Sequence, residues 1–556
     1  MNRNVESRFS ELPAANIRRS TFDMSGSVKT SFNAGLLIPF FCEEVLPGDT
    51  FDVTTSSVIR SHTLLTPIMD DMYLDRYYFF VPNRLVWEHW PEFCGENTSG
   101  PWAVTKEYRM PCISAPSGGF DIGTLADYFG LPVKKNFNAT SELSPSSLPF
   151  RAYALICNEF FRDENVTDPL HIPLGDADTI GSNGSDYIND VAKGGKPFRV
   201  AKYHDYFTSA LPAPQKGAAV GVPVSVSVAI PKLPVKTGAV YDVNAAPVKF
   251  RYSDQLLSSG ELAVSSDNGG LFVKGSSQPG FDRILPANLW TDSVTTSPDN
   301  VNIPVNDLRL AFALQRYLET LARSGSRYTE VLLGLFGVRS PDARLQRPEY
   351  LGGNRVHIDV TQVDNTAQTS VDFLGDVGAQ SQTGDVHHDF IKSFTEHGYV
   401  IGVCAVRYDH SYSQGFRRMW MRKKFTDFYN PQFANLGEFP VYKAELFCED
   451  NSANLTKSKI FGYQEAWAEY RYRPNMVTGE MRPGVDNTLA HWNLSDQYLT
   501  APTLSDAWIR EDLSNVDRCL TVSSSVSHQF WMDTFISVKA TRPMPMYSIP
   551  GLDGHL

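Results

Sequence analysis

The stretch YVIGVCAVRYD, Tyr399–Asp409, is apolar at almost every position. A run of this kind predicts a strand in the middle of a sheet, buried on both faces. A second strand is predicted by the aromatic run LDRYYFFV, Leu74–Val81, which ends at Pro82. Residues with high β-propensity gather in three further segments, which we also expect to be strands: Phe51–Arg60, Trp467–Arg473 and Phe530–Ala540.

Helical signals are fewer. In Asp307–Ala322 the apolar residues recur along one broad face, and Arg151–Asp163 is a second candidate helix. The 556 residues include 34 Phe, 24 Tyr, 39 Gly and 35 Pro, a composition typical of many strands joined by long loops. The sequence therefore predicts a mainly β fold with a few helices. A jelly roll, in which two antiparallel sheets close into a sandwich, fits this pattern, although composition alone does not separate it from other β sandwiches.

The chain divides by composition into four parts. Residues 1–30 are polar and lean basic, as an extended N-terminal arm would be, and we expect the arm to be internal. Residues 31–211 carry the first part of the strand-rich region, and residues 305–556 carry the helix and the remainder. Between them, residues 212–304 are rich in Val, Ser, Gly and Pro, and we interpret this segment as a β-rich insertion.

The formal net charge is −12, so the chain cannot coat nucleic acid by charge alone. Any contact with nucleic acid must be local or delegated to a basic partner. The seven cysteines are scattered without CxxC spacing, which argues against a disulfide framework or a zinc site. The first residues lack the apolar core of a signal peptide, and no run is long and apolar enough to insert into a membrane. We expect assembly in a cytoplasm.

Several long strings of residues resemble one known family. They are STFDMSGSVKTSFNAGLLIPF at Ser20–Phe40, EVLPGDTF at Glu44–Phe51, the segment Leu308–Gly353, YSQGFRRMW at Tyr412–Trp420 and EAWAEYRYRPNMVTGEMRPG at Glu465–Gly484. In this order they resemble the major capsid proteins of gokushoviruses, a branch of the Microviridae with circular single-stranded DNA. Because the strings run from near residue 20 to near residue 484, the resemblance covers most of the chain.

The resemblance implies a single eight-stranded antiparallel jelly roll with long loop insertions. It further implies a T=1 icosahedral shell built from copies of this one chain in the virion, assembled in the cytoplasm of a host bacterium. Inside the shell a small basic DNA-binding protein would accompany the packaged single-stranded DNA. One insertion would form a protrusion at each threefold axis, and residues 212–304 have the place and composition for it.

One segment combines cations with aromatic rings, as a surface for single-stranded DNA requires. In Gly415–Tyr429 the cations Arg417, Arg418, Arg422, Lys423 and Lys424 are interleaved with Phe416, Trp420, Phe425, Phe428 and Tyr429. In Trp467–Arg473, strand alternation would place Arg471 and Arg473 on one face, beside Tyr470 and Tyr472. A subunit interface favours the same residue types and stays open as the alternative. The arm offers a third set of candidate DNA contacts: Arg3, Arg8, Arg18 and Arg19.

The sequence contains few residues in patterns typical of catalysis or metal binding. The sequence has no P-loop, GxSxG or HExxH motif. His387, His388 and Asp389, with Glu396 and His397 nearby, match no common metal spacing, so we expect no metal there. The loop Gly175–Asp186 has three carboxylates but lacks the bidentate Glu of an EF-hand, and we interpret it as a solvated acidic loop. We therefore expect no enzyme activity and no cofactor.

The 212–304 insertion is the candidate for contact with a receptor on the bacterial host surface. Its turn clusters SSDNGG and GSSQPG would present residues at a tip, and the candidates are Ser258, Asp267, Asn268, Gly269, Gly270 and Gln278. The alternative from another class is a secreted or surface β-sandwich that binds carbohydrate or cleaves it as a glycosidase. A glycosidase needs paired catalytic carboxylates, which the sequence does not identify.

Overall fold

The computed structural model describes residues 17–97, 107–134, 137, 143–221, 305–366, 374–375, 377–449 and 459–547, and short strands between residues 235 and 291. The chain forms two compact units. The first unit comprises Met1–Ala218 and Tyr317–Leu556, and the second comprises Ala219–Arg316. In the second unit the described strands pair antiparallel in three small sheets: β8 (Val235–Thr237) with β14 (Leu289–Thr291), β9 (Phe250–Tyr252) with β10 (Gln255–Leu256) and β13 (Leu285–Pro286), and β11 (Leu262–Val264) with β12 (Leu271–Val273).

The first unit contains a six-stranded antiparallel sheet with the order β1-β23-β4-β17-β16, in which β2 also pairs with β23. Its strands are β1 (Ser20–Asp23), β2 (Gly26–Phe32), β4 (Thr50–Ser61), β16 (Val360–Asp364), β17 (Val377–Ser393) and β23 (Phe530–Arg542). Alternate residues of β23 are buried, as the strand period of two requires. The intervening residues, Trp531 and Phe535 among them, are exposed on the other face.

A four-stranded antiparallel sheet lies beside it, with the order β15-β5-β18-β3. Its strands are β3 (Ile38–Val45), β5 (Met72–Pro82), β15 (Glu349–His357) and β18 (Gly398–Tyr408). Tyr78 and Val400 from this sheet share one hydrophobic core with Phe51 and Phe530 from the other, so the two sheets face each other. The first unit is therefore mainly β and antiparallel, with its two sheets packed as in a sandwich, as predicted.

The second face of the four-stranded sheet is also buried. Phe79, Ile401 and Val403 pack into another core with Trp87 and with the helix α4 (Leu148–Ile156). Because β18 is covered on both faces, its sequence has to be apolar on both, and the prediction for Tyr399–Asp409 is confirmed. In β3, an edge strand, Pro39 is tolerated next to a register shift in the pairing with β18.

The predicted helices are also found. Asp307–Ala322 lies within α5 (Val305–Ser324), and Arg151–Asp163 overlaps α4 and the π-helical turn η3 (Cys157–Phe161). The other helices in the described residues are short: α2 (Trp90–Phe93), α3 (Leu125–Tyr128), α6 (Tyr328–Phe336), α7 (Lys443–Leu446), α8 (Asp506–Ile509) and α9 (Ser514–Cys519). Among the described helices, none has the length and apolar character to cross a membrane.

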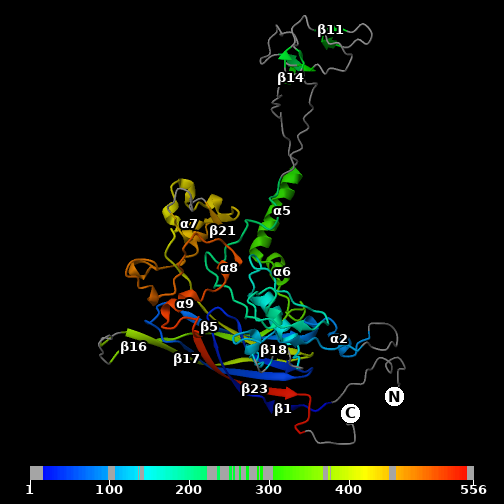
Figure 1. Ribbon diagram of the computed structural model, residues 1–556, viewed down its shortest axis with the longest axis vertical. Coiled ribbons are helices and arrows are strands. Elements are labelled where there is room, and N and C mark those ends of the chain that lie inside the picture. The colour runs from blue at the N-terminus through cyan, green and yellow to red at the C-terminus, as the bar shows by residue number, and fades with distance from the viewer. Residues whose placement is uncertain are drawn as a thin grey trace. The chain divides into compact units, whose positions relative to one another are not determined.

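Two-stranded pairs complete the first unit: β6 (Ile113–Ser114) with β7 (Thr179–Ile180), β19 (Ser411–Tyr412) with β22 (Asn475–Met476), and β20 (Phe439–Tyr442) with β21 (Ile460–Gln464). Figure 1 places α7 and β21 at one end of the first unit and β1 and β23 at the other. The segments that sequence reasoning singled out for DNA are therefore divided between the two ends, since Gly415–Tyr429 contacts α7 and Arg19 precedes β1.

Candidate nucleic-acid and subunit interface

The basic–aromatic segment Gly415–Tyr429 is not a strand. It coils through two 3-10 turns, η5 (Arg418–Met421) and η6 (Phe425–Asp427). The carboxylate of Asp427 accepts hydrogen bonds from the backbone N–H groups of Lys423 and Lys424, both at 2.8 Å. These two bonds lower the pKa of Asp427. The turn is thereby fixed as an N-cap fixes a helix, and both lysine side chains are exposed on it.

Two of the arginines in this segment are internally paired. Arg422 donates a hydrogen bond to Glu469 at 3.1 Å, and its guanidinium lies 4.2 Å from the centre of the Tyr470 ring. Arg418 donates to the carbonyl of Pro440 at 2.8 Å and lies 3.8 Å from Glu469. Both side chains are largely buried. Because their charges are matched by carboxylates of the same chain, these arginines stabilise the fold locally and offer little to a phosphate.

Most of the other cations in this region are free, and one is paired. Arg417, Lys423, Lys424 and Arg473 are exposed and form no ion pair with any residue that the structure describes. Arg471 pairs with Glu465 and also donates to the carbonyl of Ala466. Of the seven cations predicted in this region, four are therefore available to a partner: Arg417, Lys423, Lys424 and Arg473.

The strand predicted at Trp467–Arg473 is wrong. Trp467 has a left-handed backbone with φ of 64°, and the 3-10 turn η9 (Ala468–Tyr470) follows it. The buried Trp467 ring explains the turn, since its Nε1 donates to the carbonyl of Phe433 at 3.0 Å. The ring also packs edge-on against Phe439, with centroids 5.2 Å apart. Without a strand there is no alternation of side chains, so nothing places Arg471 and Arg473 on one face.

The predicted aromatic residues are on the surface. Trp420 is 71% exposed and Phe425 is 80% exposed. Phe416, Tyr429, Tyr470 and Tyr472 are also exposed, and Met419, Phe428, Phe433 and Leu436 extend the same patch. Exposed apolar side chains in this number are typical of interaction surfaces. We call it the aromatic patch, defined as the exposed side chains of residues 416–436 together with Tyr470 and Tyr472.

A cavity of about 430 Å³ opens at the edge of the aromatic patch. Its wall combines aromatic rings with arginines, among them Tyr206, Tyr412, Phe416, Arg417 and Arg482. Buried beneath it, Glu445 accepts a hydrogen bond from the hydroxyl of Tyr206 at 3.1 Å. Burial raises the pKa of Glu445. The region thus has aromatic surface for stacking and cations for an anionic partner.

The N-terminal candidates lie elsewhere. Arg3 and Arg8 lie outside the described residues, whereas Arg18 and Arg19 are exposed immediately before β1. Strand β1 pairs with β23 in the six-stranded sheet, from Ser20 opposite Arg542 onward. Strand β1, which Arg18 and Arg19 precede, lies at the end of the first unit opposite α7, whose Ala444 accepts a hydrogen bond from Phe416 (Figure 1). The host-contact candidates Ser258, Asp267, Asn268, Gly269, Gly270 and Gln278 also lie outside the described residues.

The polar groups weighed as metal ligands have protein partners. His387 Nδ1 lies 3.0 Å from Asp389, and His388 Nε2 lies 2.9 Å from Asp52. In the acidic loop, Asp176 accepts from the Trp87 indole at 2.8 Å, and Asp178 accepts from the backbone N–H of Cys112 at 2.7 Å. Within the described part of the chain, no group of three or more His, Cys, Asp or Glu side chains is arranged to hold a metal ion.

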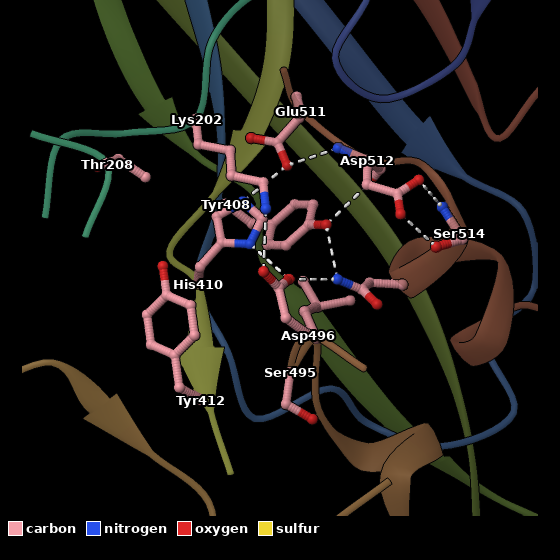
Figure 2. A network of polar contacts seen from close by, with 12 residues as sticks. Lys202, Thr208, Tyr408, His410, Tyr412, Ser495, Asp496, Glu511, Asp512 and Ser514 are labelled. Carbon is pink, nitrogen blue, oxygen red and sulfur yellow. Dashed lines mark hydrogen bonds and ion pairs between the residues drawn. The ribbon is translucent and has the colours of Figure 1, made fainter. Parts of the chain in front are cut away.

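Sequence reasoning missed a buried ionic network, shown in Figure 2. The His410 ring lies between two carboxylates, 2.7 Å from Asp496 and 2.9 Å from Glu511. Lys202 pairs with Asp496 at 2.9 Å, and all four side chains are buried. Asp496 also accepts hydrogen bonds from Tyr498 and Asn515. Because these residues come from four separate stretches of chain, no local pattern in the sequence reveals the network.

The network shifts the protonation of its members. Burial lowers the pKa of His410, but the carboxylates of Asp496 and Glu511 outweigh burial and raise it to about 9. Burial raises the pKa of Asp496, but His410 and Lys202 outweigh burial and hold it below its ordinary value. At neutral pH the imidazole is therefore protonated and Asp496 is ionised. The network ties the end of β18 to the loops that precede β23.

The known proteins that this chain resembles are all capsid proteins. A family model described as Capsid protein (F protein) matches residues 10–552. The Capsid protein VP1 of Spiroplasma virus 4 is 39% identical over 554 residues, covering 98% of this chain and 97% of the relative. The Capsid protein VP1 of Chlamydia phage 1 is 38% identical over 596 residues, covering 99% and 98%. That of Bdellovibrio phage phiMH2K is 35% identical over 563 residues, covering 99% of each chain.

These matches span nearly the whole chain, so they include both the two sheets and the long segments that connect their strands. The resemblance to gokushoviruses of the Microviridae is confirmed, and the carbohydrate-binding or glycosidase alternative finds no support. A capsid protein is a component of the virion, and its working form is an assembly of many copies. The chain belongs to the Capsid protein (F protein) family and is a major capsid protein of a gokushovirus-type phage.

Proposed function

We propose that this capsid protein builds a T=1 icosahedral shell around circular single-stranded DNA, using one jelly roll per copy. The strand order supports the jelly roll. Strands β2, β23, β4 and β17 are neighbours in one sheet, and β3, β18, β5 and β15 are neighbours in the other. Chain neighbours such as β4 and β5 thus alternate between facing sheets, as Greek-key connections require.

The observation that carries self-assembly in this chain is the aromatic patch. The first unit already has complete cores between and behind its sheets. Trp420 and Phe425 are nevertheless left open to solvent. We therefore assign the patch to a neighbouring copy. Its free cations, Lys423 and Lys424 among them, then meet the surface of a chain whose net charge is −12.

The test of this assignment is reversal of charge at Lys423 and Lys424, both changed to Glu in the full chain, with electron microscopy of the product. Loss of particles, with the isolated chain still folded, supports the subunit contact. Normal particles that lack DNA would instead assign the two lysines to the genome. Dispersed chains from the unmodified protein, under conditions that assemble its relatives, would contradict the shell itself.

The genome requires its own contacts. We assign packaged single-stranded DNA to the arm, with Arg18 and Arg19 at its base and Arg3 and Arg8 further out, and to a small basic internal protein. The net charge of −12 supports the second partner, because this chain alone cannot neutralise the phosphates. The role is structural, needs no cofactor and no catalysis, and is completed in the cytoplasm of the bacterial host.

Attachment to the host is assigned to residues 212–304, as the protrusion at the threefold axis. The position of this segment supports the assignment, because most of it belongs to the second compact unit, Ala219–Arg316, and it ends where α5 begins. Deletion of residues 258–280 should give intact particles that no longer adsorb to cells. Normally infectious particles, or failure to assemble, would contradict this role.

A further inference from the structure

The cavity at the edge of the aromatic patch is lined only by residues of the first unit. The buried part of its wall carries aromatic rings, among them Tyr206 and Tyr412. The exposed part carries further rings, among them Phe416 and Tyr472. The volume of about 430 Å³ lies within the range of small-molecule sites. The cavity can therefore hold a flat ring among aromatic side chains.

Two buried polar atoms of the wall residues have no hydrogen-bond partner within the described part of the chain. They are the hydroxyl oxygen of Ser413 and the Nε atom of Arg422. Ser413 is 9% exposed, and the Arg422 side chain is 10% exposed. Because buried polar groups are normally paired, these two call for a partner from outside the chain. A ligand that offers hydrogen-bond acceptors satisfies both once their side chains turn toward it.

The wall also carries arginines that are free to meet an anion. Arg417 and Arg482 are exposed and form no ion pair with any described residue. The carboxylates of the wall are already engaged, since Glu445 and Glu469 accept hydrogen bonds from their own chain. With four arginines and two glutamates, the wall has a net charge of +2 in a chain whose net charge is −12. The cavity is thus a local site for an anionic group.

A nucleotide has all three of the required groups in one molecule. Its base is a flat ring that stacks on aromatic side chains and guanidinium planes, and the edge of the base carries hydrogen-bond acceptors. Its phosphate is a strong partner of arginine. No amino-acid side chain combines an aromatic ring with a negative charge at neutral pH, because the pKa of tyrosine is about 10. The cavity therefore fits a nucleotide better than a single side chain inserted by a neighbouring copy.

We infer that this cavity binds a nucleotide. The base lies among the rings of Tyr206, Tyr412 and Tyr472, and the phosphate lies at the two free arginines. A free nucleotide and a nucleotide unit of packaged DNA present the same chemistry to the site. The inference goes beyond the proposed function, because it depends neither on the shell nor on the contacts assigned to the arm. Failure of the chain to assemble would therefore count against the proposed function alone.

Calorimetric titration of the unassembled chain with deoxyadenosine monophosphate tests the site. The nucleotide should bind about tenfold more tightly than deoxyadenosine or inorganic phosphate, because it alone supplies both the ring and the anion. Arg482→Gln should weaken nucleotide binding by about tenfold and leave deoxyadenosine binding unchanged. Lys423→Gln is the matched control, since Lys423 is an exposed cation of the same region outside the wall. Absence of binding, or equal weakening by the two variants, would overturn the inference.

The variant Ser413→Ala separates binding from a role in the fold. Because the hydroxyl has no hydrogen-bond partner among the described residues, its removal should leave the melting temperature of the unassembled chain unchanged. Affinity for the nucleotide should nevertheless fall by about fivefold, since the hydroxyl loses its partner on the base. An unchanged affinity would overturn this placement of the base.

Ultraviolet irradiation of purified particles, followed by mass spectrometry, identifies the source of the nucleotide. The peptide that carries Tyr472 should be joined to DNA if the genome occupies the cavity. The same peptide should gain the mass of one nucleotide if a free nucleotide occupies it. Particles in which the peptide gains neither would overturn the inference.

Discussion

The Nδ1 atom of His410 lies 2.7 Å from Oδ1 of Asp496, and both side chains are buried. The imidazole keeps its proton because Asp496 and Glu511 raise its pKa to about 9, although burial and Lys202 lower it. Since the folded pKa exceeds the ordinary value of 6.5, protonation of His410 stabilises the fold fully below pH 6.5. That stability is lost as the pH rises through 9.

The first prediction is a loss of stability at alkaline pH. Between pH 6.5 and 9.5 the free energy of unfolding should fall by about 3 kcal/mol through His410. Chemical denaturation of the unassembled chain across this range measures the fall. The variant His410→Gln should be less stable at pH 6 and should show a shallower dependence on pH. If the variant follows the same curve as the parent, another group titrates.

The second prediction separates paired from free cations. Arg422→Ala leaves Glu469 short of a partner in a largely buried place, so it should lower the free energy of unfolding by about 1–3 kcal/mol. Lys423→Ala should change it by less than about 0.5 kcal/mol, because Lys423 is exposed and forms no ion pair among the described residues. Denaturant titration of both unassembled variants measures the two changes in the free energy of unfolding. A Lys423→Ala cost equal to that of Arg422→Ala would contradict the division.

The third prediction concerns the aromatic patch. Trp420→Ser combined with Phe425→Ser should leave the unassembled chain as stable as before, because both side chains are exposed in it. The yield of particles in sucrose gradients should fall, because the buried contact between copies loses its anchors. Leu499→Ser, which alters another exposed apolar side chain, is the control and should assemble normally. Normal assembly of the double variant would remove the patch from the interface.

The fourth prediction concerns a second buried charge, Asp75 in β5. Its carboxylate pairs with Arg355 at 2.8 Å and with Arg407, and it accepts the Tyr203 hydroxyl at 2.8 Å. Asp75→Asn should cost about 3–5 kcal/mol, because it leaves a buried guanidinium unpaired.

The matched control for Asp75 is Asp533→Asn, which removes an exposed carboxylate paired with Lys29 at 3.5 Å. Exposed pairs of this kind contribute about 0–1 kcal/mol. Thermal unfolding of the two unassembled variants should therefore separate them clearly. Similar melting temperatures would show that the Asp75 cluster is no more stabilising than a surface pair.

The sequence predicts the strands whose burial follows a simple pattern, continuous in β18 and alternating in β4 and β23. Strand β18 is covered on both faces, so its sequence is a continuous apolar run. Helix α5 is recognised by the helical spacing of its apolar residues. Strand β17 was missed, although it is an internal strand of the six-stranded sheet, between β4 and β16. Its inward positions include Ser381 and Thr383, and the polar groups on both faces hide the alternation.

The candidate site was predicted in composition but not in detail. Arg418 and Arg422 find Glu445 and Glu469 across loops that no local pattern connects, so their pairing depends on the tertiary fold. The same holds for the His410 network. The turn at Trp467 depends on a left-handed backbone, which is rare for a residue with a large side chain and therefore unexpected.

Strands β5 and β15 pair antiparallel, with Phe80 opposite Glu349. The whole chain from Asn83 to Pro348 therefore leaves and re-enters the sheet at adjacent strands, so it is topologically the loop of one hairpin. Each doubling of such a loop costs only about 0.6 kcal/mol in closure entropy. A change in the length of this connection therefore costs the two sheets little, and the same junction is a natural grafting point for displayed peptides.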